Sequence, residues 1–148
     1  GELADIIREI AESGKPLLGI CLGFQLLFDE SHEYGTTKCL GLVSGKVVPI
    51  PPGRTIPHMG WNLVKFDEGM ELFNGLGDGK HFAFAHSYHA EVTDPEAAVA
   101  STNYEGMDIV ASVQKKNIFG CQFHPEKSGN DGLQILKNFE KICKSKIK

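Results

Sequence analysis

Several features that mark specialised classes of protein are missing from this chain of 148 residues. Its four cysteines are unevenly spaced and include no CxxC pair, so the sequence indicates neither a disulfide framework nor a zinc site. Reduced thiols in the cytoplasm are therefore the default expectation. The longest apolar run, residues 16–28, is too short to span a bilayer and is interrupted by two glycines and Gln25. We accordingly expect no association with a membrane.

The charge balance narrows the choice of partners in the same way. The formal net charge is −4, and Lys and Arg cluster only in residues 137–148. A nucleic-acid-binding face should be basic overall, so this cluster is better explained as the solvated side of a terminal helix. Apolar residues make up 41% of the chain and charged residues 23%, as in ordinary globular proteins. Without repeats or a linker, residues 1–148 are interpreted as one domain.

The hydrophobic pattern predicts an α/β domain. Apolar residues at helical spacing predict a helix over residues 3–11 with one buried face, ended by Gly14 and Pro16. The short apolar run over residues 17–21 is typical of a buried strand in a parallel sheet, and residues 22–30 are predicted to form the next helix. An amphipathic helix is predicted over residues 133–147. Further strands are predicted at residues 46–50, 62–66, 81–92, 108–115 and 118–124.

Cys21 lies in a G-x-C-x-G motif between the first predicted strand and the helix that follows. The motif is the thiol counterpart of the G-x-S-x-G nucleophile elbow, in which glycines permit a tight, strained turn. At a helix N-terminus the dipole favours the thiolate, and the N–H of Leu22 is placed to stabilise an oxyanion. The alternative is an inert cysteine buried in an apolar strand.

His124 and Glu126 end the last predicted strand. In an extended segment the two side chains point to the same face, so the carboxylate can hold the imidazole in one tautomer. Pro125 indicates that the hydrogen-bonded ladder has ended there. Catalytic sites of open α/β sheets lie at the carboxyl ends of strands, where Cys21 is also expected. The pattern predicts a Cys21, His124 and Glu126 triad; a structural histidine is the alternative.

Other polar residues are compatible with a pocket beside the cysteine. Gln25 lies one helical turn after Cys21 and either contacts a substrate there or is an exposed helix residue. A polar cluster at residues 86–89 follows an apolar strand and suits a pocket or a half-exposed strand. Within it, His86 and His89 are the only close pair of potential metal ligands, but they are three residues apart on one predicted strand and should face opposite sides.

Together these residues resemble the class I glutamine amidotransferase family, and within it the glutaminase subunits of imidazole glycerol phosphate synthases in histidine biosynthesis. The segments that carry the resemblance are residues 16–28 (PLLGICLGFQLLF), 57–62 (PHMGWN), 86–88 (HSY) and 122–126 (QFHPE). The first and last segments mark the class. The PHMGWN segment points to these subunits rather than to those serving anthranilate, purine or pyrimidine synthesis.

The resemblance implies a flavodoxin-like, three-layer sandwich with a mostly parallel central sheet. It assigns catalysis to the Cys21, His124 and Glu126 triad, without a cofactor or a metal. It assigns glutamine recognition to Gln25 and to the backbone of Ser87 and Tyr88. The implied reaction is hydrolysis of glutamine to glutamate and ammonia through a glutamyl thioester.

The resemblance also implies a protein partner. Met59, Trp61 and Asn62 would face a (β/α)8-barrel cyclase, which receives the ammonia through a tunnel within a heterodimer. Aromatic residues and methionine are enriched at protein interfaces, which agrees with this assignment. The alternative for Trp61 is a place in the domain's own core.

The sequence departs from the family at two places. Phe24 stands where methionine is usual, an apolar exchange with little consequence. The family begins with a strand, a helix and a glycine-rich loop that supplies a second oxyanion donor, and these have no counterpart here. We therefore expect an incomplete protein that, as it stands, is at best a poor catalyst. Its first helix has an apolar stripe that needs a sheet to cover it. The stripe comprises Leu3, Ile6, Ile7 and Ile10.

Three other functions stay open at this point. The same triad would serve a γ-glutamyl or peptide hydrolase of this fold, or the glutaminase subunit of another class I amidotransferase. A binding or regulatory module without catalysis is the third, and the complete set of Cys21, His124 and Glu126 argues against it. The predicted partner-facing segment argues against a free hydrolase.

Overall fold

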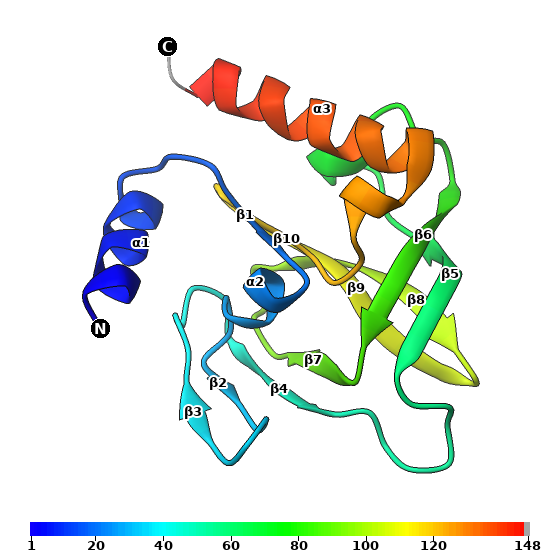
Figure 1. Ribbon diagram of the computed structural model, residues 1–148. Coiled ribbons are helices and arrows are strands. Elements are labelled where there is room, and N and C mark those ends of the chain that lie inside the picture. Colours follow the sequence, from blue (N-terminus) through cyan, green and yellow to red (C-terminus); the bar gives the residue numbers. More distant parts are fainter. Residues whose placement is uncertain (147–148) are drawn as a thin grey trace.

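The computed structural model describes residues 1–146, which form two sheets with helices around them (Figure 1). The predicted helix end at Ile147, and Lys148 of the basic tail, lie outside the described residues. The helices are α1 (Glu2–Glu12), α2 (Leu22–Gln25) and α3 (Gly129–Lys146), with the 3-10 helices η1 (Glu71–Phe73) and η2 (Pro125–Lys127). A six-stranded sheet has the order β1-β10-β9-β8-β5-β6, and a four-stranded sheet has the order β3-β2-β4-β7.

The strands of the larger sheet are β1 (Leu17–Ile20), β5 (His58–Lys65), β6 (Gly79–His86), β8 (Ala98–Tyr104), β9 (Met107–Lys115) and β10 (Ile118–Cys121). Those of the smaller sheet are β2 (Glu30–Ser31), β3 (Thr37–Lys38), β4 (Gly45–Pro49) and β7 (Tyr88–Val92).

The α/β class is confirmed, but the prediction of a mostly parallel sheet is wrong. Within the larger sheet only β1 and β10 run parallel, and the other neighbouring pairs are antiparallel. For two of these pairs, β8–β9 and β9–β10, the reason is the length of the connection, because parallel neighbours need a long crossover whereas short turns make hairpins. Only Glu105 and Gly106 separate β8 from β9, and both have positive φ, as a two-residue hairpin turn requires.

Three further expectations need correction. The predicted strand 81–92 is two strands, because the chain leaves the larger sheet after His86 and joins the smaller one at Tyr88. The predicted helix 22–30 ends at Gln25, and the following residues form turns that lead into β2. The sequence analysis missed β8, a strand whose alternation of small and polar residues resembles that of a loop.

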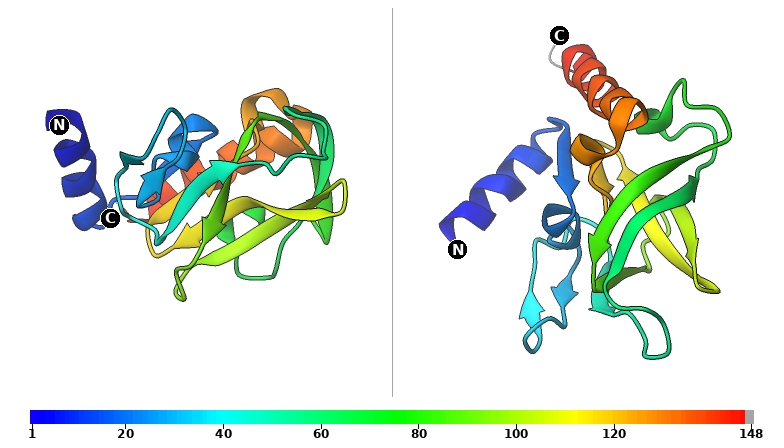
Figure 2. Two further views of the ribbon diagram at one scale, coloured as in Figure 1. Left: turned by 90° about the horizontal axis from the view of Figure 1, so that it is seen from below. Right: turned by 45° about the vertical axis from the view of Figure 1, so that its right-hand side comes forward.

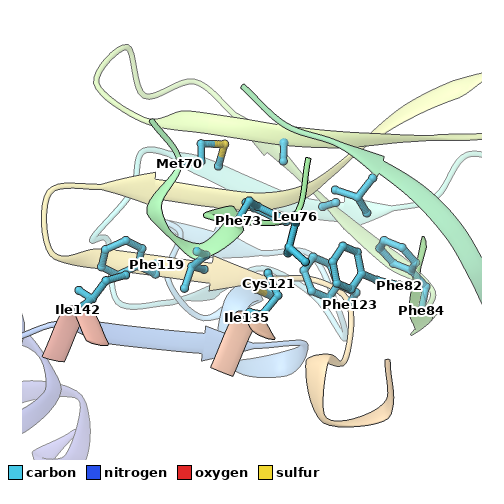
Figure 3. Packing of buried hydrophobic residues seen from close by; sticks show 14 residues of the cluster. Met70, Phe73, Leu76, Phe82, Phe84, Phe119, Cys121, Phe123, Ile135 and Ile142 are labelled. Atoms are coloured by element: carbon cyan, nitrogen blue, oxygen red, sulfur yellow. The ribbon is translucent and has the colours of Figure 1, made fainter. Parts of the chain in front are cut away.

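Both sides of the β1–β10 pair are covered by apolar side chains. Phe119 and Cys121 of β10 belong to a cluster that reaches Ile135 and Ile142 of α3 (Figure 3). On the other side, a Cβ atom at Gly120 would lie 2.6 Å from the ring of Phe24, the residue of α2 that packs there. The end of this strand pair, where the site lies, is therefore held from two directions.

Helix α1 forms where it was predicted, but its apolar stripe is not buried. The helix projects away from the rest of the molecule beside β1 (Figures 1 and 2). Leu3, Ile6 and Ile10 are exposed, and only Ala11 of this helix is buried. Arg8 connects the helix to the loop after β3 through the carbonyls of Cys39 and Leu40. Among the described residues no helix is long and apolar enough to cross a membrane.

Candidate active site

Cys21 sits in a tight turn at the carboxyl end of β1. Strand β10 runs parallel to β1 with Ile20 opposite Cys121, and the Cys21 N–H donates to the Cys121 carbonyl at 2.7 Å. The backbone of Cys21 has φ 52°, a left-handed conformation that a residue with a side chain rarely adopts. A Cβ atom on Gly19 would lie 2.5 Å from the carbonyl oxygen of Gly23, so only glycine fits there. This is the strained elbow that the motif predicted.

His124 follows β10 at the same end of the sheet and is paired with Glu126. Its Nδ1 lies 2.9 Å from Glu126 Oε2, across the first turn of η2 rather than along an extended segment. Ser128 fixes the backbone of the histidine: its hydroxyl donates to the His124 carbonyl and accepts the N–H of Ala83 on β6. The predicted His–Glu pair is present, through a turn geometry that the sequence did not indicate.

A pocket of about 300 Å³ opens beside the cysteine. It is lined by Cys21, Leu22, Gln25, Glu33, Tyr34, Ala85, His86, Ser87 and Tyr88. The residues expected to bind glutamine therefore meet around the expected nucleophile. A larger hollow of about 480 Å³ lies between η1 and α3, but its lining contains neither a cysteine nor a histidine.

The Cys21 sulfur makes no hydrogen bond to His124. Its hydrogen-bond contacts are the Ala85 carbonyl and the Gln122 amide, each at 3.9 Å. Burial raises the pKa of the Cys21 thiol; the Leu22 N–H lowers this pKa, but by less. The expectation of a thiolate favoured by a helix dipole is therefore wrong, because α2 has only four residues and burial dominates. The resting site holds a thiol that needs a base.

The second cysteine of this region illustrates the alternative that was weighed for Cys21. Cys121 is fully buried, its exposed fraction is 0%, and burial raises the pKa of its thiol to about 12. Cys21 is half-buried and lines the pocket. Of the two adjacent thiols, Cys21 alone is accessible to a substrate.

Residues 1–142 match the family model described as glutamine amidotransferase class-I. The chain belongs to this family. It is 50% identical over 140 residues to imidazole glycerol phosphate synthase subunit HisH of Pyrococcus furiosus, covering 95% of this chain and 72% of that protein. It is 47% identical over 142 residues to the subunit of the same name from Moorella thermoacetica, covering 96% of this chain and 67% of that protein.

Solved structures of this family share the fold. A glutamine amidotransferase from Thermotoga maritima matches with a TM-score of 0.62 at 19% identity, covering 99% of this chain and 56% of that one. A second glutamine amidotransferase matches with a TM-score of 0.67 at 20% identity, covering 93% of this chain and 68% of that one. At such low identity these matches support the fold alone.

Gln122 and Glu33 lie near Cys21, but the sequence analysis gave neither of them a role. Gln122 is fully buried, and its Oε1 accepts a hydrogen bond from Gln25 Nε2 at 3.1 Å while its own amide faces the Cys21 sulfur. Glu33 brings a carboxylate to the pocket from the loop between β2 and β3. Neither shows a local signal, except that Gln122 stands two residues before His124 at the end of the same strand.

Gln25 is buried, which excludes the alternative of an exposed helix residue. Besides Gln122, its amide donates to the Tyr88 carbonyl at 3.1 Å. Among residues 1–146 no group of three His, Cys, Asp or Glu side chains is arranged to hold a metal ion. His86 and His89 lie on different strands, and His86 pairs instead with His58 at 2.9 Å.

The predicted partner-facing residues lie on β5. Met59 and Trp61 are two positions apart on this strand and are exposed, with 68% and 59% of their surface accessible. The alternative of Trp61 in the domain's own core is therefore excluded. Asn62 is half-buried and donates to the Asn103 carbonyl and to His58.

Proposed function

We propose that this chain hydrolyses glutamine to glutamate and ammonia, as the glutaminase part of an imidazole glycerol phosphate synthase in histidine biosynthesis. The observation that carries the proposal is the pocket of about 300 Å³ lined by Cys21 and Gln25, at the end of β1. The His124–Glu126 pair follows β10, the strand paired with β1, at the same end of the sheet. The relatives at 47 and 50% identity support the choice among amidotransferases.

Proton transfer from the thiol is the first step. Because Glu126 accepts the Nδ1–H of His124, the Nε2 lone pair of the imidazole is free to act as a base. The sulfur, resting against the Ala85 carbonyl, must turn away from it to give its proton to His124. The buried thiolate so formed is paired with the imidazolium, which offsets the desolvation that raises the thiol pKa.

Acyl transfer follows. Cys21 attacks the carboxamide carbon, and the negative charge that develops on the amide oxygen lies against the Leu22 N–H. His124 returns its proton to the departing nitrogen, so ammonia leaves and a glutamyl thioester remains. A water molecule, deprotonated by His124, then attacks the thioester carbonyl and releases glutamate and the thiol.

The pocket also suits the amino-acid end of glutamine. Glu33 is an acidic residue in the pocket lining, and its carboxylate would pair with the α-ammonium group of the substrate. Ser87 and Tyr88 offer backbone groups in the same lining, where the chain passes from β6 to β7. The charge of Glu33 therefore favours a free amino acid, which carries an α-ammonium group, over an internal residue of a peptide.

Ammonia is transferred to a (β/α)8-barrel cyclase that docks against β5. The exposed pair of Met59 and Trp61 supports this part of the proposal, since methionine and tryptophan are enriched at interfaces. Asn62, on the same strand, contributes a polar group at the edge of the contact.

The deciding experiment measures glutamate and ammonia release by the protein with and without its cyclase. We expect activity with the cyclase and its loss in Cys21→Ala, whose folding should be unchanged because the thiol is half-buried and outside the apolar clusters. Covalent labelling by a glutamine-analogue electrophile should require Cys21 as well. Activity of Cys21→Ala within about tenfold of the parent would contradict the mechanism.

The same assay separates the alternatives. Release of ammonia that is independent of the cyclase, together with cleavage of γ-glutamyl peptides, would favour a free hydrolase. Stimulation by the synthase partner of another pathway would assign the chain to a different amidotransferase. A folded protein that neither reacts with the electrophile nor hydrolyses glutamine would favour a binding module.

A further inference from the structure

A chain of hydrogen bonds runs from β5 to the wall of the glutamine pocket. Asn62 Nδ2 lies 3.4 Å from His58 Nε2, His58 Nδ1 lies 2.9 Å from His86 Nε2, and His86 Nδ1 lies 2.7 Å from the Tyr88 carbonyl. Both imidazoles are buried, with 1% and 7% of their surfaces exposed. The glutaminase reaction described above uses neither of them.

The groups that hydrogen-bond to each imidazole determine which ring nitrogen carries the proton. A carbonyl only accepts, so His86 must donate to Tyr88 from Nδ1, and its Nε2 is then the acceptor of a neutral ring. His58 must therefore donate from Nδ1, which leaves its Nε2 to accept from the Asn62 amide. Burial lowers the pKa of both histidines to about 4, which keeps both rings neutral near pH 7.

This series of hydrogen bonds ends at the Tyr88 carbonyl, which also contacts a side chain of the pocket lining. The Tyr88 carbonyl accepts a second hydrogen bond, from Gln25 Nε2 at 3.1 Å. Gln25 is in turn bonded to Gln122, whose amide faces the Cys21 sulfur. A shift of the Tyr88 carbonyl would therefore move Gln25, a side chain of the pocket lining, and loosen the contact made by Gln122.

We infer that His58 and His86 form a tautomer-locked pair of positioning residues, which holds the Tyr88 carbonyl and through it Gln25 in the arrangement that binds glutamine. The inference rests on the proposed glutaminase function and adds a specific role for two residues outside the triad. His58 is held between the rings of Phe84 and Tyr104, with centroids at 4.6 and 3.9 Å, so the donor at its Nδ1 has a fixed direction.

Two substitutions separate the hydrogen bond from the packing. His58→Phe keeps a ring between Phe84 and Tyr104 but removes the donor to His86. His58→Asn loses the ring and places an amide N–H near the position of the imidazole Nδ1. If His58 acts as a positioning residue, the KM for glutamine should rise in the variant that lacks the donor, His58→Phe. If its role is merely structural, the KM should rise in whichever variant is less stable.

For His58→Phe with the cyclase present, we expect the KM for glutamine to rise about five- to tenfold, the value of one lost hydrogen bond of about 1 kcal/mol. The kcat should change much less, because the triad is untouched. In His58→Asn the KM should return towards that of the parent even though thermal stability falls. An unchanged KM in His58→Phe, or a KM that follows the melting temperature across both variants, overturns the inference.

The tautomers give a readout that does not depend on activity. Long-range 15N–1H NMR spectra of the parent near neutral pH should show Nδ1-protonated, neutral rings for both His58 and His86. A ring protonated at Nε2 in either residue overturns the assignment. A parent protein without glutaminase activity in the presence of its cyclase would instead refute the proposed function, and with it the role that rests on it.

Discussion

The buried histidine pair makes the stability of this protein sensitive to mild acid. Burial lowers the pKa of His58 and of His86 from 6.5 to about 4 in the folded chain. Between about pH 6.5 and about pH 4 the unfolded chain binds more protons than the folded one. The contribution of the neutral histidines to the free energy of unfolding is therefore fully present above about pH 6.5 and is lost as the pH falls towards about 4. For one imidazole of this kind the loss at about pH 5 is about 2 kcal/mol, so the two together lose about 4 kcal/mol.

Neighbouring charges modify this estimate without changing its sign. Glu105 raises the pKa of His58, but by less than burial lowers it. His89 and His124 oppose the protonation of His86, whereas the Tyr88 carbonyl favours it. Burial also lowers the pKa of His89, which adds a loss in the same direction.

The test compares urea unfolding at about pH 7.5 and about pH 5. The parent should lose at least about 2 kcal/mol between the two conditions, and His58→Phe should lose about 2 kcal/mol less than the parent. His81→Gln is the matched control, because His81 is an exposed histidine of β6 and should leave the parental difference intact. Equal losses in the parent and in His58→Phe, within about 0.5 kcal/mol, would refute the reasoning.

Three further predictions concern the elbow, the triad and the partner face. Gly19→Ala places a Cβ atom 2.5 Å from the Gly23 carbonyl and displaces the nucleophile, so kcat/KM should fall about a hundredfold; unchanged kinetics would show that the turn adapts. His124→Ala should lower kcat about 10²- to 10⁴-fold and Glu126→Gln less, since the carboxylate orients the ring but carries no proton; steady-state kinetics in which Glu126→Gln is worse would reverse these roles. Trp61→Ala should weaken cyclase binding about thirtyfold, or about 2 kcal/mol, measured by titration calorimetry. Its melting temperature should hardly change because the side chain is 59% exposed, and lost stability with unchanged binding would contradict the interface.

Local geometry explains why much of the site was predictable from the sequence. The G-x-C-x-G motif specifies a turn within five residues. The structure contains this turn, with Gly19 packed against Gly23 and a positive φ at Cys21. His124 and Glu126 are two residues apart, so they meet whether the segment is extended or, as found, begins a 3-10 turn.

Where the sequence analysis failed, the deciding contacts join distant segments. Apolar periodicity shows which face of an element is hydrophobic, but not which segment packs against that face. The apolar stripe of α1 could therefore be predicted, whereas its exposure in the fold could not. The same limit applies to strand direction. The alternation of apolar residues is similar in parallel and antiparallel strands. Which strands become neighbours depends on contacts between distant segments, such as those that place β5 between β8 and β6.

By itself, the sequence determined the tight turn at Cys21, the His–Glu pair and the α/β class, because each depends on neighbours within a few residues or on the hydrophobic pattern. Only the tertiary structure decided that Glu33 lines the pocket, that the Gln122 amide faces the Cys21 sulfur, and that burial raises the pKa of the Cys21 thiol. It also decided that His58 meets His86 across two paired strands. Desolvation and hydrogen bonding depend on what surrounds a group in space, and that surrounding is assembled from segments far apart in the chain.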